Sequence, residues 1–151
     1  MRYLGIDYGD KRIGLAVSDD EARFAVPYDV IEEQSIDASI KKIQSLVREE
    51  GITTIVVGIP LSLGKRTDPP KTLRTPDIEN VQMQRVQQFI AQLRTALFIP
   101  IETIDERLST VEAERRMKGA PKNVRAQKDA VAASIILQSY LDRASSASLA
   151  G

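Results

Sequence analysis

Cysteine, histidine and tryptophan are all absent from this chain of 151 residues. Without cysteine the protein has no disulfide, no thiolate metal site and no cysteine nucleophile. Without histidine it lacks the commonest general base and the commonest zinc ligand, and it cannot form a Ser-His-Asp triad. Any catalysis must therefore use carboxylates, lysine, tyrosine, hydroxyl groups or a bound cofactor.

Long apolar runs and an excess of either charge are missing too. No stretch approaches the roughly 20 apolar residues that a transmembrane helix needs, and Asp7 falls where a signal peptide would be apolar. We therefore expect a cytoplasmic protein with no membrane partner. The 21 basic residues balance the 21 acidic ones, so net charge does not indicate a nucleic-acid partner, and 5% aromatic residues argue against extensive base stacking.

What the sequence does contain is a regular succession of strand and helix patterns. The predicted strands are residues 3–7, 12–18, 24–31, 53–59 and 101–105, and the predicted helices are 36–50, 78–97, 109–119 and 124–143. Three locally connected strands predict an antiparallel edge, and the helical crossovers add two parallel strands. We expect one α/β domain over residues 1–143, with a five-stranded mixed sheet and helices on both faces, and a flexible tail over 144–151.

Acidic residues occupy three places where structure alone would favour neutral ones. Asp7 ends the first strand, which we expect to be central. Asp129 begins the apolar stripe of the last helix, where a charge costs several kcal/mol unless it is paired or bound to a cation. Asp105 and Glu106 end the last strand, and ligands of α/β sheets gather at the carboxyl ends of strands. A salt bridge or a helix cap accounts for any one of these acids about equally well.

Taken together, the three places suggest a metal site. Clustered oxygen ligands without histidine or cysteine select Mg²⁺ or Mn²⁺ rather than zinc, and two such ions about 4 Å apart can cleave a phosphodiester. Residues 107–128 carry seven basic side chains against two acidic ones, which is typical of phosphate binding but also of a solvated basic surface. The candidate nucleic-acid contacts are Lys11, Arg12, Arg107, Lys122, Arg125 and Lys128.

Four segments resemble the YqgF family, also called RuvX: residues 4–19, 57–61, 105–110 and 128–133. The resemblance implies a ribonuclease H-like fold and a nuclease that matures the 5′ end of precursor 16S rRNA, with the resolution of branched DNA as the alternative. It implies metal ligands at Asp7, at Asp129 and at one acid of the 105–106 pair. We favour Glu106, with Asp105 close behind.

In two places the chain departs from that pattern. Resolvase relatives often carry an acid after the fourth strand, whereas residues 58–61 contain none, and the loop over 64–76 is longer than usual for the family. Two other classes stay open. A non-catalytic RNA- or ribosome-binding module could keep the fold without the chemistry. An actin-like sugar kinase starts similarly to residues 5–9 but needs a second lobe. A monomer or a homodimer is compatible with the sequence.

Overall fold

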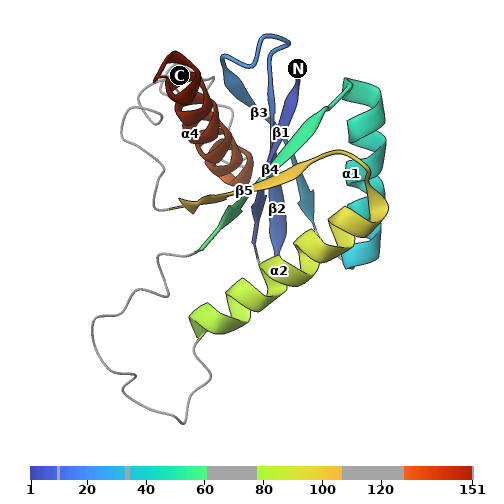
Figure 1. Cartoon of the computed structure of the whole chain (residues 1–151). Coiled ribbons are helices and arrows are strands. Elements are labelled where there is room, and N and C mark those ends of the chain that lie inside the picture. Colours follow the sequence, from blue (N-terminus) through green and yellow to red (C-terminus); the bar gives the residue numbers. More distant parts are fainter. Residues whose placement is uncertain (10, 33–34, 61–77, 107–127, 151) are drawn as a thin grey trace, which may run out of the picture.

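The protein is described from a computed structural model over residues 1–9, 11–32, 35–60, 78–106 and 128–150 (Figure 1). Its elements, in chain order, are β1 (Tyr3–Tyr8), β2 (Arg12–Ser18), β3 (Ala25–Glu32), α1 (Ile36–Glu50), β4 (Thr54–Ile59), α2 (Ile78–Ala96), β5 (Ile101–Asp105) and α4 (Lys128–Ala150). In this part of the chain no helix is long and apolar enough to cross a membrane.

The strands form one five-stranded mixed sheet in the order β3-β2-β1-β4-β5. β2 is antiparallel to both β1 and β3, while β4 is parallel to both β1 and β5. This confirms the predicted sheet, including the central place of β1. Because β1, β4 and β5 run in the same direction, their carboxyl ends meet at one edge of the sheet, where ligands of α/β folds gather.

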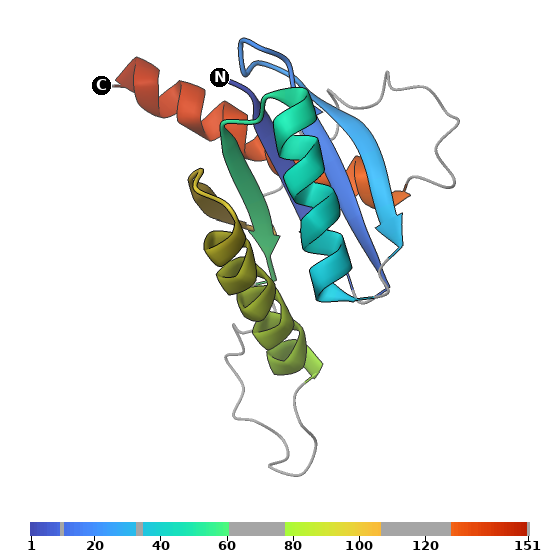
Figure 2. The ribbon, with the colours of Figure 1, turned by 90° about the vertical axis from the view of Figure 1, so that its right-hand side faces the viewer.

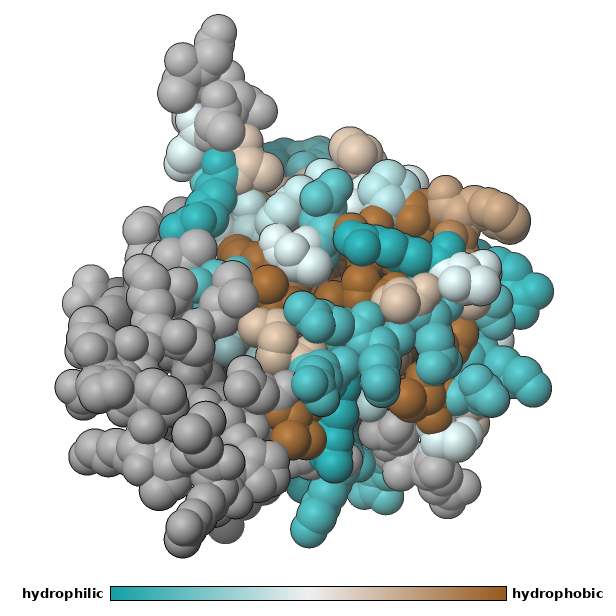
Figure 3. All heavy atoms as spheres, turned by 60° about the horizontal axis from the view of Figure 1, so that its bottom comes forward, coloured by the Kyte–Doolittle hydropathy of each residue, from teal (hydrophilic) through white to brown (hydrophobic). Residues whose placement is uncertain are grey.

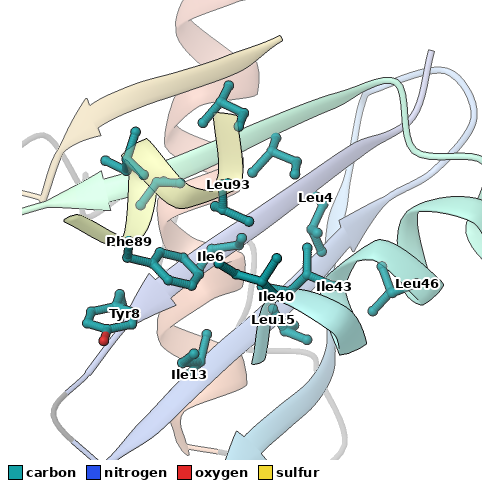
Figure 4. Close-up of a cluster of buried hydrophobic side chains, with 14 of the residues drawn as sticks. Leu4, Ile6, Tyr8, Ile13, Leu15, Ile40, Ile43, Leu46, Phe89 and Leu93 are labelled. Carbon is teal, nitrogen blue, oxygen red and sulfur yellow. The ribbon is translucent and has the colours of Figure 1, made fainter. Parts of the chain in front are cut away.

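Helices cover both faces of the sheet, as the sequence predicted. α1 and α2 lie side by side on one face, and α4 lies on the other (Figure 2). The first core joins residues of β1 and β2 to Ile40, Ile43 and Leu46 of α1 and to Phe89 and Leu93 of α2 (Figure 4). A second core on the opposite face includes Ala133, Ile136, Leu137 and Leu141 of α4.

Local signals in the sequence account for the boundaries of α1. Ser35 precedes the helix and its side chain accepts a hydrogen bond from the backbone N–H of Ala38, so it is the N-cap. Gly51 ends the helix in the left-handed conformation, with φ of 65°, and its N–H donates to the carbonyl of Val47. A glycine adopts this conformation without strain, which explains why the helix stops there.

The edge strand β3 carries the irregularity that its proline predicted. Leu15 of β2 is opposite Asp29, but Ala16 is opposite Pro27, so Tyr28 is an extra residue in the ladder. Proline cannot donate a backbone hydrogen bond to a ladder and is confined to edge strands and bulges. Pro27 lies both in an edge strand and at a bulge. The bulge also makes this edge a poor template for further strand pairing.

The largest difference from the predicted elements concerns α4. The sequence predicted that this helix ends at Arg143, with a tail from residue 144, whereas the helix continues to Ala150. Alanine has the highest helix propensity, and it recurs among the serines of this segment. The other predicted boundaries within the described residues agree with the structure to within one residue. The predicted helix over 109–119 and the predicted loops over 64–76 and 120–123 lie outside the described residues.

Polar side chains cover much of the described surface, with apolar ones between them (Figure 3). The large hydrophobic side chains that stay exposed in the described part of the chain are Met1, Phe24, Val26, Tyr28, Val81 and Phe98.

Candidate active site

Three glycines on the α4 face of the sheet allow this helix to lie directly against the strand backbones. They are Gly5 in β1, Gly14 in β2 and Gly58 in β4. A Cβ atom on the first would lie 2.7 Å from the Cβ of Leu137, and one on the third would lie 2.7 Å from the Cδ1 of Ile136. A Cβ atom on the second would overlap the backbone carbonyl group of Asp129. The amino end of α4 therefore makes its closest approach to the sheet at β2.

Asp7 lies on this same face, near the carboxyl end of the central strand. It is directly opposite Gly14 in the antiparallel ladder, and side chains alternate across a strand, so it shares its face with Gly5 and Tyr3. The Tyr3 ring packs on Tyr140 of α4, with ring centroids 5.8 Å apart, which fixes the face. The carboxyl group is mostly buried, as expected for a central strand under a helix.

Glu106 follows β5 and reaches Asp7 across the intervening strand β4. A Cβ atom on Gly58 would lie 3.3 Å from the Cγ of Glu106, so the side chain passes over a glycine. The carboxyl groups of Glu106 and Asp7 share a hydrogen bond. Asp105 is buried and acts on Glu106 through its charge. Of the two adjacent acids, the structure thus places Glu106 against Asp7.

Burial and like charge hold a proton between these two carboxyl groups. The pKa of Asp7 is raised from 3.8 to about 7, above all by burial and then, in decreasing order, by the charge of Glu106, the hydrogen bond with Glu106 and the charge of Asp129. Burial also raises the pKa of Glu106, although the hydrogen bond from Asp7 opposes this rise. The hydrogen bond raises the pKa of Asp7 and lowers that of Glu106, so Asp7 is the donor and Glu106 the acceptor.

Asp129 lies in the first turn of α4, whose backbone packs on Gly14 beside Asp7. It is half-buried, and its charge acts on Asp7. Among the described residues, no three acidic side chains lie close enough together to hold a metal ion in this arrangement. The donor set nevertheless suits a divalent cation, because it consists of oxygens and because its charges repel one another until they are neutralised.

Three of the predicted basic contacts surround this edge of the sheet. Lys11 and Arg12 lie at the turn between β1 and β2, and Lys128 begins α4, and all three are exposed. Arg12 also makes an ion pair with Glu32 across the ladder, with an N–O distance of 3.9 Å. The other predicted contacts, Arg107, Lys122 and Arg125, lie outside the described residues.

The sequence did not predict the residues that hold α4 against the sheet and the loop before β3. Gln138 is fully buried; it accepts a hydrogen bond from the backbone N–H of Ala25 and donates to the carbonyl of Arg23 and to Asp142. A polar residue beside an apolar stripe gave no signal of this role. The glycines could have been noticed, because glycine inside a strand often marks the close approach of another backbone.

Comparison with known proteins now assigns the family. Residues 1–143 match the RuvX family profile, described as "Holliday junction resolvase". The chain belongs to the RuvX family. RuvX relatives include a Chloroflexus aurantiacus protein named "Putative pre-16S rRNA nuclease", 40% identical over 92% of this chain and 85% of its own length. Proteins of the same name from Roseiflexus and Maridesulfovibrio salexigens are 41% and 40% identical, over 93% and 95% of this chain and 94% and 100% of theirs.

Solved structures support the ribonuclease H-like fold of this RuvX protein. RuvC from T. thermophilus in complex with a Holliday junction substrate superposes with a TM-score of 0.66 at 14% identity, over 97% of this chain and 96% of that one. The yeast mitochondrial Holliday junction resolvase Ydc2 gives a TM-score of 0.51 at 12% identity, over 92% and 77%. At such low identities the similarity concerns the fold, and the predicted ribonuclease H-like architecture is confirmed.

Proposed function

We propose that this RuvX protein is a metal-dependent nuclease that hydrolyses a phosphodiester bond during maturation of the 5′ end of precursor 16S rRNA. The observation that carries the proposal is the partly buried, hydrogen-bonded pair of Asp7 and Glu106 at the carboxyl edge of the sheet, with the charge of Asp129 acting on Asp7. Two partly buried carboxyl groups that share a hydrogen bond are costly for stability and suit a functional role. The relatives' shared name supplies the substrate class, and a nuclease with such a substrate would act in the cytoplasm.

Asp7, Glu106 and Asp129 would hold Mg²⁺ or Mn²⁺, in a two-ion site by analogy with other phosphodiester hydrolases. When bound, the metal supplies positive charge to the scissile phosphate and lowers the pKa of a coordinated water. The carboxyl groups would contribute oxygen ligands in a geometry that the sheet sets. Asp7 would have to lose its proton before it could bind the metal. Asp105 adds negative charge behind Glu106.

The missing acid after β4 does not weaken this assignment. Residues 58–61 contain no carboxylate, but Gly58 leaves the space through which Glu106 extends to Asp7. In this chain, therefore, β5 supplies an acid on the far side of β4, and a third ligand from β4 itself is unnecessary. Lys11 and Lys128, which are both exposed, would contact phosphates of the substrate.

Resolution of branched DNA is the second candidate, because the family description and the fold of RuvC favour it. A resolvase must cut two opposed strands, so it should act as a symmetric homodimer. Processing of the 5′ end of an RNA needs one active site, and a monomer suffices. Light scattering at the working protein concentration distinguishes the two states.

The decisive experiment compares an RNA that carries the 16S precursor 5′ extension with a four-way DNA junction. Each is incubated with Mg²⁺ or Mn²⁺, with EDTA, and with the Asp7→Asn variant. Cleavage of the RNA that is lost both with EDTA and in the variant supports the proposal. Cleavage of the junction alone selects the resolvase. Binding without cleavage of either substrate, free or within a precursor ribosomal particle, contradicts the nuclease and selects the binding module.

A further inference from the structure

Gly14 is the residue on which the amino end of α4 rests. A Cβ atom there would overlap the carbonyl carbon and oxygen of Asp129 and would lie 3.0 Å from the backbone nitrogen of Ala130. These are backbone atoms, so no side-chain rotation can relieve the overlap, and the helix itself would have to move.

The reason for a glycine at this position is space rather than backbone conformation. Gly51 is the one described glycine with positive φ, so Gly14 has a backbone conformation that other residues adopt without strain. At Gly58 the nearest atom is the end of the flexible Ile136 side chain, which can shift. Gly14 is therefore the glycine whose replacement most directly displaces the first turn of α4.

The position of Gly14 in the ladder links this contact to the proposed metal ligands. Gly14 is paired with Asp7, and the helix residue that touches it is Asp129. The distance between α4 and the sheet is thus set where the backbone of Asp129, a proposed ligand, packs on Gly14, the ladder partner of Asp7, which is another proposed ligand. We propose that Gly14 is a positioning residue that fixes how closely the Asp129 carboxylate approaches the Asp7–Glu106 pair. This inference rests on the metal site of the proposed function.

The size of the expected displacement suggests a compensating change. Relieving the overlap of an alanine Cβ with the Asp129 carbonyl requires the helix to retreat by about 1–2 Å, close to the length of one C–C bond at roughly 1.5 Å. Glutamate exceeds aspartate by one methylene group. A glutamate at position 129 should therefore return its carboxylate to the other two acids once α4 has moved.

The test uses four variants: Gly14→Ala, Asp129→Glu, the double variant, and Gly5→Ala as the matched control. The control makes the same substitution under the same helix, but against Leu137 and Ala133 rather than Asp129. Calorimetric titration with Mn²⁺ alone measures binding, and Tm without metal measures stability. We expect Gly14→Ala and Asp129→Glu each to weaken Mn²⁺ binding about tenfold or more. The double variant should regain most of that loss, and Gly5→Ala should bind within about threefold of the parent despite a lower Tm.

Two results would overturn the inference: a double variant that binds Mn²⁺ no better than Gly14→Ala, or a Gly5→Ala variant that loses as much affinity. Should Gly14→Ala fail to fold, Asp129→Glu alone still tests the inference: with α4 at its native depth the longer side chain should weaken Mn²⁺ binding, and binding as tight as in the parent contradicts the inference. Crystal structures of the parent and of the variant give a metal-independent readout, in which Asp129 must lie farther from Asp7 in the variant. A parent that binds no Mn²⁺ contradicts the proposed function, while an unmoved Asp129 contradicts this inference.

Discussion

The carboxyl groups of Asp7, in β1, and Glu106, directly after β5, share a hydrogen bond across β4, the strand that lies between β1 and β5. Gly58 of that strand provides the space for this contact. We therefore expect Gly58→Val to obstruct it and to lower cleavage by at least about tenfold. Gly58→Ala should have a smaller effect, because the Ile136 side chain can shift. Cleavage rates of both variants check the order, and equal rates for Gly58→Val and the parent would show that Glu106 does not need this path.

Asp7→Asn should abolish metal-dependent cleavage while the fold is retained. The amide keeps the shape of the carboxyl group but removes a ligand charge, so the loss should exceed the roughly 10–100-fold cost of removing an outer-shell partner of a metal ligand. Circular dichroism and Tm report the fold, and Asp20→Asn, an exposed acid outside the site, is the control. A variant that no longer folds would show that Asp7 has a structural role instead.

The metal-free protein should become less stable as pH rises from about 4 to above 7. The pKa of Asp7 is near 3.8 when unfolded and about 7 when folded, so between these values the folded state binds more protons than the unfolded state and stability falls with pH. The raised pKa of Glu106 acts in the same direction. Tm of the EDTA-treated protein should therefore decrease across this range, and less so in Asp7→Asn.

A divalent cation should reverse that pH dependence. Because ligand carboxylates must be deprotonated, Mg²⁺ or Mn²⁺ should raise Tm strongly at pH 8 and weakly at pH 5. Parallel Tm curves with Mg²⁺ and with EDTA, at equal ionic strength, measure the difference. A rise in Tm that is the same at both pH values, or that persists in Asp7→Asn, would place the cation elsewhere.

Lys11→Ala and Lys128→Ala should weaken nucleic-acid binding in a salt-dependent way. Each lost phosphate contact should reduce the slope of log K against log salt by about 0.7 to 0.9. Lys42→Ala is the matched control, since Lys42 is exposed on α1 on the opposite face of the sheet. Lys122→Ala and Arg125→Ala should behave like the first two. Binding curves identical to the parent at every salt concentration would contradict the assignment.

Gln138→Met should lower stability without acting on the chemistry. The substitution keeps the volume but leaves the N–H of Ala25 and the carbonyl of Arg23 without their partner, at a cost of about 1–3 kcal/mol for each buried group. Urea denaturation measures the loss, and Gln87→Met on the exposed side of α2 is the control. At a temperature where the variant is folded, cleavage should be close to the parent rate.

The sequence predicted the sheet well because strands and their turns are local features. The apolar run over 53–59 and the Pro27 irregularity both identified their strands, and the order of strands and helices was enough to place β1 at the centre. The structure brings the predicted acids Asp7 and Glu106 together, but the sequence did not indicate their geometry. Which of Asp105 and Glu106 turns towards Asp7 depends on strand register and on the space above Gly58, and neither is visible in a local pattern.

The remaining errors have physical causes of the same kind. The predicted end of the last helix ignored the alanines that follow Arg143. The buried role of Gln138 depends on hydrogen bonds to a loop that is far away in sequence. A hydrophobic pattern reports which face of an element is covered, but it does not identify the polar atoms that meet across the contact.

The placement of Asp129 on α4 has a consequence for protein synthesis. The ribosome makes chains from the amino end, and domains generally form as their last segment becomes available. The segments that form the five strands, and Glu106 after them, are all synthesised before α4. Because a domain folds as a unit, the strands of a growing chain should not form a stable sheet before α4 has been made. An unfinished chain therefore lacks both the stable sheet and one of the three candidate ligands, so the candidate metal site can form only after α4 has been made.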